Sequence, residues 1–276
     1  MCLNGGIKLI CPICSGRLER IENSYVCPER HSFDIARQGY VNLLPVQNKH
    51  SRSPGDTKSM LMARREFLNS GFYEPVCSDI AGLVNKYKPS EYPAAVDVGC
   101  GEGYYTEKIA GLCNAEMAGV DIAKEAAKMS CSRSRDILWL VATGSHIPIE
   151  DKSVDVITAV FSLFMNDEYA RLLKNGGIVV EVSAGSDHLK ELKSIIYDEV
   201  FPQNKKQSDF SDNFSLLCEY DRRFEITLIQ NQLKALLAMT PHIHRINREQ
   251  SERLEALDSL ELTVNYKIRV LGKGRG

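Results

Sequence analysis

The 276-residue sequence predicts an α/β fold preceded by a small metal-binding module. Three features of the sequence support this prediction. Three cysteines and a histidine gather near the start of the chain, and a glycine-rich turn further on joins an apolar strand to a helix. From that turn as far as residue 183, segments of strand and helix character alternate, which is typical of a parallel sheet with helices on its faces.

The composition is that of an ordinary folded protein. Hydrophobic residues make up 43% and charged residues 25% of the chain, and the net charge is -2, which excludes a disordered or collagen-like class. The longest apolar stretch, VITAVFSLF, is about half of what a bilayer span requires, and the first ten residues do not make a secretory signal. The nine cysteines are odd in number and mostly scattered, so we expect reduced thiols and a cytoplasmic location.

The segment CPICSGRLERIENSYVCPERH has the spacing of a zinc site. A pair of cysteines is followed by a pair formed by a cysteine and a histidine, and a Cys-Pro turn begins each pair. The four side chains can bind one metal ion in a tetrahedron. A redox Cys-x-x-Cys pair would need a strand before it and a helix after it, and would not need the second pair. We therefore expect one structural Zn²⁺ per chain in a zinc-ribbon-like module over residues 1–36. The candidate ligands are Cys11, Cys14, Cys27 and His31.

The segment AAVDVGCGEGYYTEKIA, residues 94–110, predicts a strand, a tight turn and a helix that begins near Tyr104. A dinucleotide-binding turn has the spacing G-x-G-x-x-G so that a pyrophosphate can lie on the helix N-terminus. Here the spacing is G-x-G-x-G with two carboxylates, Asp97 and Glu102, which would repel a pyrophosphate. They suit a cofactor with a positively charged methionine part, and we predict S-adenosylmethionine.

The next predicted strand, AEMAGVDIA, ends in Asp121, where a carboxylate can bind the two ribose hydroxyls of the cofactor. Capping of the following helix is the alternative role for this residue. Further buried strands are expected at residues 154–161 and 178–182, which completes a Rossmann-like methyltransferase fold over residues 91–276. The cofactor-binding candidates from these segments are Asp97, Gly99, Gly101, Glu102, Gly103 and Asp121.

The sequence after residue 183 is less regular. Helices are expected at residues 186–201 and 226–239, an exposed loop at 203–213, and a terminal strand at 260–273.

Residues 37–90 form a basic bridge and a helical lead-in. Between residues 37 and 65, six basic side chains stand against one acidic side chain. Such a stretch can neutralise phosphates, and Arg64 and Arg65 are expected to contact RNA. A solvated loop is the alternative interpretation.

The sequence resembles the bacterial 23S ribosomal RNA guanine-N(1)-methyltransferases over nearly its whole length. The similar segments include CPIC, NSYVCPERHSFDIARQGYVNLLPVQNKHSRSPGDTKSMLMARREFLNSGFY, VDVGCGEGYYT, HLKELKSIIYDEV and MTPH. The most specific part runs from the zinc motif through VNLLPVQ and SPGD, because methyltransferases in general lack that combination.

This resemblance implies S-adenosylmethionine-dependent methylation of guanine N(1), with a zinc module that helps to hold a hairpin loop of 23S ribosomal RNA. It implies the same four zinc ligands. It also implies cofactor contacts at Tyr73, Gly101, Glu102 and His188, all of which match here. The sequence leaves a homodimer open.

One segment departs from the family. FSLFMNDEYARLL, which follows the fourth predicted strand, lacks the proline that relatives usually have near the substrate. Asp167 and Glu168 are candidates for a base by position alone, and we assign no catalytic residue. Two other functions remain open: a methyltransferase for a small molecule, and a catalytically inactive, zinc-bearing RNA-binding relative.

Overall fold

The computed structural model describes residues 6–45, 55–197, 210–244 and 246–274. Within them, one large sheet is built from β4 (Val41–Asn42), β5 (Ala94–Val98), β6 (Glu116–Asp121), β7 (Leu138–Val141), β8 (Val154–Val160), β9 (Leu173–Ala184), β10 (Phe214–Ile229) and β11 (Ser259–Lys273). The strand order is β10-β11-β9-β8-β5-β6-β7-β4. Strands β4 to β9 pair with one another in parallel. Strand β11 lies between β9 and β10 and is antiparallel to both.

The order of the strands reverses at β5. This strand lies between β6 and β8. Strands β6 and β7 follow on one side of β5, and β8 and β9 then follow on its other side. In open sheets of this kind, ligands bind outside the carboxyl ends of the strands at the point of reversal. The glycine loop follows β5 and therefore lies at this point.

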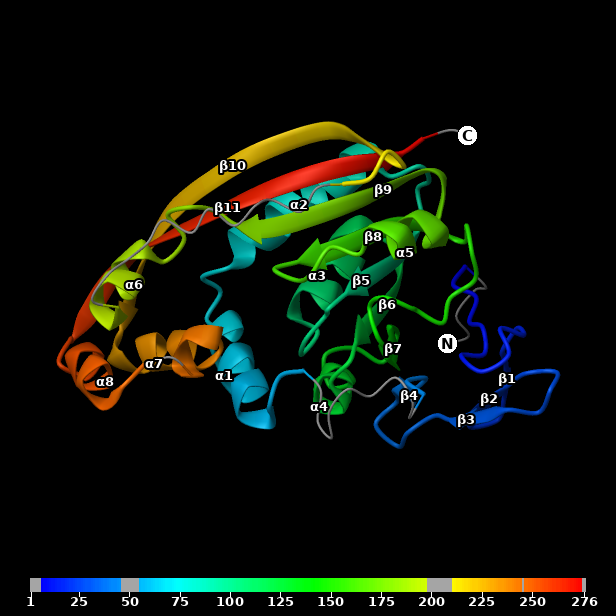
Figure 1. The fold of residues 1–276 in the computed structure, drawn as a ribbon, viewed down its shortest axis with the longest axis horizontal. Coiled ribbons are helices and arrows are strands. Elements are labelled where there is room, and N and C mark those ends of the chain that lie inside the picture. The colour runs from blue at the N-terminus through cyan, green and yellow to red at the C-terminus, as the bar shows by residue number, and fades with distance from the viewer. Residues whose placement is uncertain (1–5, 46–54, 198–209, 245, 275–276) are drawn as a thin grey trace.

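The helices are α1 (Lys58–Asn69), α2 (Glu74–Tyr87), α3 (Tyr104–Cys113), α4 (Lys124–Ser130), α5 (Asn166–Leu172), α6 (Lys190–Ile196), α7 (Gln230–Ala238) and α8 (Arg248–Glu255), with a 3-10 turn, η2 (Pro241–His244). Figure 1 shows α6, α7 and α8 gathered at one end of the long β10–β11 hairpin. No helix among the described residues is long and apolar enough to cross a membrane.

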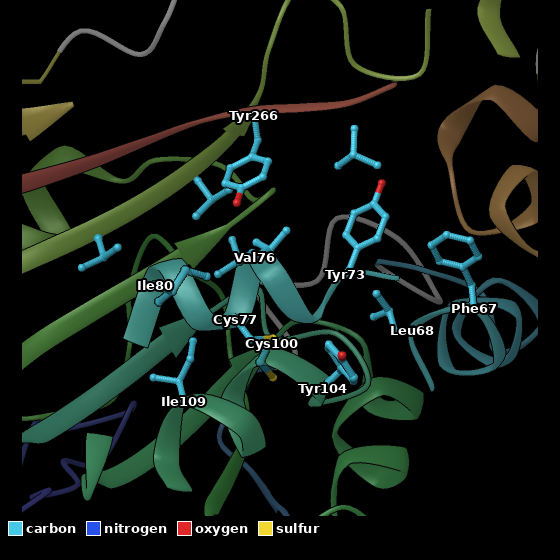
Figure 2. Close-up of a cluster of buried hydrophobic side chains, with 14 of the residues drawn as sticks. Phe67, Leu68, Tyr73, Val76, Cys77, Ile80, Cys100, Tyr104, Ile109 and Tyr266 are labelled. Carbon is cyan, nitrogen blue, oxygen red and sulfur yellow. The ribbon is translucent and has the colours of Figure 1, made fainter. Parts of the chain in front are cut away.

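The central strands of the sheet are buried on both faces, as the mainly apolar sequences of β5 and β8 predict. Successive residues of a strand point to opposite faces, so Val180 belongs to one buried cluster and Val179 to another. Figure 2 shows the first cluster, in which Val76 and Ile80 of α2 pack under the sheet and Tyr266 reaches α2 from β11. The hydroxyl of Tyr266 donates to Asp79 at 2.7 Å.

The second cluster joins the zinc-binding segment to the opposite face of the sheet. The segment folds as three short antiparallel strands, β1 (Glu19–Ile21), β2 (Ser24–Val26) and β3 (Ser32–Asp34). Just before them, the Ile10 N–H donates to the Pro148 carbonyl at 3.0 Å, and Leu9 pairs with Ile149. Cys11 and Cys27 belong to the same buried cluster as Ile149, so the zinc module and the sheet share one core.

The expected central strands and the helix start at Tyr104 are confirmed, but two helices differ from expectation. The helix expected at 226–239 begins at Gln230, because residues 226–229 complete β10. Strand β10 pairs with β11 over nearly its whole length. The helix expected at 186–201 begins at Lys190 and is described to Ile196; residues 198–201 of it, and residues 203–209 of the expected loop, lie outside the described residues.

Candidate functional site

The four predicted zinc ligands meet at one point. Their ligand atoms all lie within 4.8 Å of one another. The Sγ atoms of Cys14 and Cys27 are 3.6 Å apart, and His31 Nδ1 lies 3.4 Å from Cys27 Sγ and 3.6 Å from Cys11 Sγ. A tetrahedral zinc with bonds of about 2.3 Å to sulfur and about 2.1 Å to nitrogen requires ligand separations of roughly this size.

Two tight turns position these ligands. Ser15 and Arg30 have positive φ angles of 58° and 63°, and each follows or precedes a ligand in its turn. The N–H of Cys27 donates to the His31 carbonyl at 3.1 Å, which closes the second turn. Burial opposes the thiolate of Cys27, but hydrogen bonds, chiefly from the His31 backbone, outweigh it and lower the pKa of Cys27 to about 7. A lowered pKa favours the thiolate that a metal binds.

A cavity of about 340 Å³ lies at the carboxyl ends of the central strands. The glycine loop forms one wall, and side chains from α1, the start of α2 and the turn before α6 form the others. Of the predicted cofactor residues, the ones that line this cavity are Tyr73, Gly99, Gly101, Glu102 and His188. Asp97, Gly103 and Asp121 are not among the lining residues.

The three glycines of the loop all have positive φ angles, between 55° and 89°, which only glycine adopts at little cost. A Cβ atom at Gly103 would lie 2.8 Å from Trp139, and one at Gly99 would lie 2.7 Å from the Ser162 Cβ. At Gly101 a Cβ would meet the Arg64 guanidinium, at 3.2 Å from Nη1, on the cavity side. Gly99 and Gly103 therefore permit close packing, whereas Gly101 gives access to the loop backbone from the cavity.

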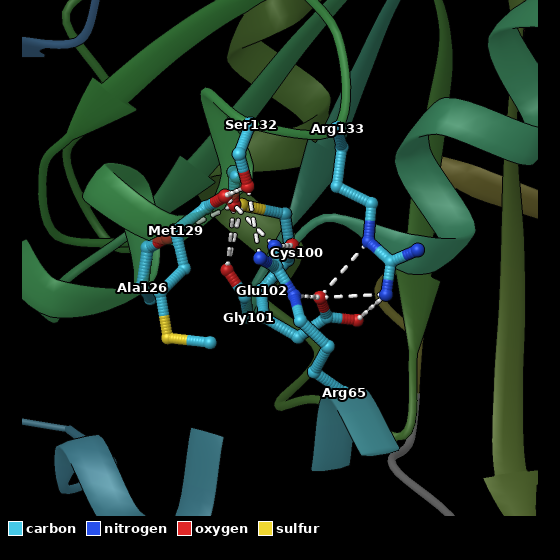
Figure 3. A network of polar contacts seen from close by, with 9 residues as sticks. Arg65, Cys100, Gly101, Glu102, Ala126, Met129, Ser132 and Arg133 are labelled. Atoms are coloured by element: carbon cyan, nitrogen blue, oxygen red, sulfur yellow. Dashed lines mark hydrogen bonds and ion pairs between the residues drawn. The ribbon is translucent and has the colours of Figure 1, made fainter. Parts of the chain in front are cut away.

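Glu102 is held by two arginines (Figure 3). Its side chain has no exposed surface, and its carboxylate accepts hydrogen bonds from Arg65 Nε at 2.8 Å and from both Arg133 donors at 2.8 to 2.9 Å. Arg65 also donates to the carbonyls of Glu102 and Met129. The negative charge of Glu102 is thus balanced inside the protein, and its carboxylate fixes the loop.

Asp97 lies under the loop and is fully buried. It accepts hydrogen bonds from the hydroxyls of Thr106 and Thr158, the second at 2.8 Å. Burial outweighs these two donors and raises the pKa of Asp97 to about 6. Asp97 therefore ties β5 to α3 and β8 beneath the cavity.

Asp121 ends β6 beside the loop. Its carboxylate accepts the N–H of Gly101 at 2.9 Å and the N–H of Ala123 at 2.8 Å, and burial raises its pKa. The contact with Ala123, the N-cap residue of α4, matches the capping alternative. A carboxylate has about four lone-pair sites, so these two contacts leave capacity for ribose hydroxyls.

Aromatic rings from three elements converge on the cavity. Phe161, directly after β8, lies 5.7 Å from the His188 ring and 6.3 Å from the Tyr73 ring between centroids. The buried hydroxyl of Tyr73 has no hydrogen-bond partner among the described residues. Sequence reasoning did not identify Phe161 as a residue of the site. The one signal in the sequence was its place directly after a buried strand, and that place does not reveal its φ of 52°. Strained backbone of this kind is concentrated at ligand sites.

Models of two protein families match the chain. The zinc ribbon described as "RlmA, N-terminal" matches residues 9–52, and a methyltransferase domain matches residues 96–180. The four-ligand cluster lies in the first match and the glycine loop in the second. The chain joins an RlmA-type zinc ribbon to a methyltransferase domain. Together with the metal-ligand cluster, these matches confirm the two predicted cofactors, S-adenosylmethionine and zinc.

Relatives extend over nearly the whole chain. "Putative 23S rRNA (guanine-N(1)-)-methyltransferase YxjB" of Bacillus subtilis is 29% identical over 273 residues, covering 94% of this chain and 95% of the relative. The "23S rRNA (guanine(748)-N(1))-methyltransferase" of Streptomyces fradiae is 26% identical and covers 95% of each chain. The resemblance predicted from the sequence is confirmed.

Other relatives match only part of the chain. The human "Arginine-hydroxylase NDUFAF5, mitochondrial" is 28% identical over 153 residues, which cover 51% of this chain and 42% of that protein. Among solved structures, the YcgJ protein of Bacillus subtilis covers 72% of this chain and 100% of its own, with a TM-score of 0.49 and 15% identity.

S-adenosylmethionine fits the lining of the methyltransferase cavity on two observations. The buried Tyr73 hydroxyl lacks a hydrogen-bond partner among the described residues, and a bound polar ligand would supply one. Gly101 presents backbone to the cavity, where a small or polar ligand group can approach closely.

The structure corrects the expected role of Arg64 and Arg65. Arg65 is committed to Glu102 and Met129, and Arg64 lies against Gly101, where it pairs with Asp56 at 2.5 Å. Arg64 therefore lines the cavity of the methyltransferase domain, and Arg65 holds the glycine loop beside it through Glu102. The count of basic charge did not reveal these pairings, because Glu102 and Met129 lie 37 and 64 residues from Arg65, and because Asp56 was counted only as one charge of the same stretch.

The structure also removes Glu168 as a candidate base. Its side chain is 7% exposed, pairs with Arg171 and accepts the Ile147 N–H, all outside the cavity. Asp167 is exposed and does not line the cavity either. Of the departing segment, Phe161 is the residue that lines the cavity.

Proposed function

We propose that this chain methylates N(1) of a guanine in 23S ribosomal RNA with S-adenosylmethionine as the methyl donor. The observation that supports this most is the combination along one chain of an RlmA-type zinc ribbon and a methyltransferase domain. The full-length relatives named above have that activity in their names, whereas the human relative that matches only half of the chain has another. The zinc ribbon therefore carries the distinction between these functions.

The residues of the cavity bind and align the donor. When bound, S-adenosylmethionine supplies a methyl group on a positively charged sulfur. Gly101 offers backbone contacts from the glycine loop, Tyr73 and His188 line the cavity, and Asp121, which holds the Gly101 N–H beside the loop, would bind the ribose hydroxyls. Methyl transfer by in-line displacement depends on alignment more than on activation, and a rigid loop held by Glu102 provides alignment.

The target guanine has to leave its stack to reach the cavity. Proteins read RNA sequence chiefly at unstacked loop bases, and enzymes that modify bases extrude them into a pocket. Phe161, 38% exposed, lines the cavity wall and offers a ring face for such a base. We therefore place the target in a hairpin loop. The proton on guanine N(1) has to be accepted during transfer, and we assign no residue to that step.

The zinc has a structural role in this proposal. All four ligand positions are filled by protein side chains, and none of the four lines the cavity. The zinc ribbon then helps to hold the RNA while the methyltransferase domain holds the donor. The site of action would be the cytoplasm, where ribosomal RNA is made in bacteria, and a homodimer is compatible with this scheme.

Primer extension on 23S ribosomal RNA tests the proposal, because a methyl group on guanine N(1) blocks reverse transcription. RNA from cells with the gene should show one stop that is missing from RNA of cells without it. The stop should return when the gene is restored, and should appear in vitro when purified protein and S-adenosylmethionine are added to unmodified RNA. A protein that binds the donor but produces no stop on this RNA would be a methyltransferase for another substrate or an inactive relative.

A further inference from the structure

A charged side chain at the cofactor cavity has no role in the function derived so far. Arg64, on α1, lines the cavity and lies against the glycine loop at Gly101. The other two arginines at this loop, Arg65 and Arg133, are used on Glu102. Arg64 instead pairs with Asp56 and donates to the Met239 carbonyl, so a separate explanation is needed for its position at the cavity.

We propose that Arg64 binds the carboxylate of the methionine part of S-adenosylmethionine. This inference rests on the cofactor assignment of the proposed function. A carboxylate that enters a cavity requires a cationic or hydrogen-bonding partner, because its loss of hydration is costly. Of the described residues that line the cavity, Arg64 and Lys193 are the arginine and the lysine that could supply such a cation.

The contacts of Arg64 leave donors for such a partner. A guanidinium has five N–H donors in a planar fork. Arg64 Nη1 pairs with Asp56 at 2.5 Å, and Nη2 donates to the Met239 carbonyl at 3.2 Å. These two partners fix the orientation of the fork over Gly101 and leave three donors. An arginine fork matches a carboxylate with two parallel hydrogen bonds, which a lysine ammonium does not.

Asp56 has a positioning role in this arrangement. The segment at Gly55 lies against Ile122 and Ala123, just after Asp121, so that a Cβ at Gly55 would be 2.8 Å from the Ala123 Cβ. Asp56 thus reaches Arg64 from the side of the loop where β6 ends. With its side chain 30% exposed and paired, it holds Arg64 in place without itself lining the cavity.

The test compares S-adenosylmethionine with decarboxylated S-adenosylmethionine, which lacks only the carboxylate. Calorimetry on the full-length, zinc-loaded protein gives the dissociation constant for each. The wild-type protein should bind the complete cofactor about tenfold or more tightly, which is the size expected of a charge-assisted pair. Arg64→Met should bind the two ligands equally well, Arg64→Lys should retain part of the preference, and Asp56→Asn should reduce it.

Two control variants complete the design. Lys58→Met removes an exposed charge from the same helix and should retain the full preference. Lys193→Met should also retain it. The inference is overturned if Arg64→Met keeps the preference, or if Lys193→Met is the variant that abolishes it. Circular dichroism verifies the fold of each variant, and Arg64→Gln replaces Arg64→Met if the latter does not fold.

The failure of this inference is distinct from failure of the proposed function. A wild-type protein that binds both ligands equally well retains its cofactor but loses the Arg64 assignment. A folded wild-type protein that binds neither ligand contradicts the cofactor and the proposed function together. If primer extension shows no stop at a guanine, the proposed function is contradicted, but the assignment of Arg64 to the cofactor carboxylate is not.

Discussion

Glu102 shows how a loop carboxylate can be structural although it lies at a ligand site. Sequence spacing predicts that it lies beside the cofactor, and in the structure it lines the cavity. Its charge is nevertheless taken up by Arg65 and Arg133. The sequence predicted its position but not its partners, because Arg65 comes from α1 and Arg133 follows α4, and no local pattern relates these three residues.

Replacing Glu102 by glutamine should lower the free energy of unfolding by about 2 to 4 kcal/mol, because it leaves two arginines without their buried counter-charge. Urea denaturation measures this change. Glu125→Gln is the matched control: Glu125 pairs with Lys128 at 3.7 Å on an exposed helix surface, and its loss should cost less than about 0.5 kcal/mol. Equal costs for the two variants would contradict a structural role for Glu102.

Asp97 predicts a pH dependence of stability. Burial raises the pKa of Asp97 to about 6 in the folded chain, above its value of about 3.9 in an unfolded chain. Between these values the folded state keeps a proton that the unfolded state loses, so this group's contribution is favourable at low pH and is lost as the pH rises through about 6. Relative to Asp97→Asn, the wild-type protein should lose about 1 to 3 kcal/mol between pH 4.5 and pH 7, and roughly half of that near the middle of this range. Chemical denaturation at these pH values gives the difference, and a constant difference across the range would refute the assignment.

At the scale of elements, the glycine loop, the parallel strands and β11 were predictable, whereas β10 was not. Strands β5 and β8 are buried on both faces and therefore appear as mainly apolar runs, with Asp97 and Asp155 as their charged residues. Strand β10 is exposed over most of its length, with polar residues such as Asp221 and Arg222 in its middle. Its conformation follows from pairing with β11, which begins some 30 residues later in the chain. Pairing of that kind leaves no local signal.

The glycines of the loop predict two different mutational effects. Gly103→Ala should lower the free energy of unfolding by about 1 to 3 kcal/mol, because its Cβ would lie 2.8 Å from Trp139 in a left-handed conformation. Gly101→Ala should cost about 1 kcal/mol of stability but should weaken S-adenosylmethionine binding more than Gly103→Ala does, since its Cβ enters the cavity beside Arg64. Denaturation and calorimetry on both variants separate these effects, and the reverse ranking for cofactor binding would contradict them.

At the scale of the whole molecule, the zinc module is part of the main core and is not an appendage. Cys11, Leu18 and Cys27 lie in the same buried cluster as Leu140 and Ile149. Sequence reasoning predicted the ligands and the module but not the core that the module shares with the sheet. Shared burial between distant segments is a property of the folded chain alone. Deleting those residues would expose the sheet face, so it would disturb the cofactor domain as well.

Loss of zinc should therefore destabilise the whole protein. The purified protein should contain one zinc per chain by elemental analysis, and Cys27→Ser should lose it, because three remaining ligands bind the metal less tightly. The variant should melt at a lower temperature in a single transition, measured by calorimetry. The Cys218→Ser change should leave both zinc content and melting temperature nearly unchanged, since Cys218 is half-buried on β10 and is not one of the four predicted ligands. A metal-free variant whose main transition is unaltered would show that the module folds independently.

The core shared by the zinc module and the sheet also fixes a distance. Cys11 and Cys27 share a buried cluster with one face of the sheet, the cofactor cavity lies at the carboxyl ends of its strands, and the pairing of Leu9 with Ile149 ties the zinc module to the sheet. Under the proposed function, an RNA that is held at both the zinc ribbon and the cavity spans a fixed distance between them. The enzyme would then choose its guanine by how far that base lies from the part of the RNA held by the zinc ribbon, and an RNA with one nucleotide inserted between the two would present the wrong base to the cavity.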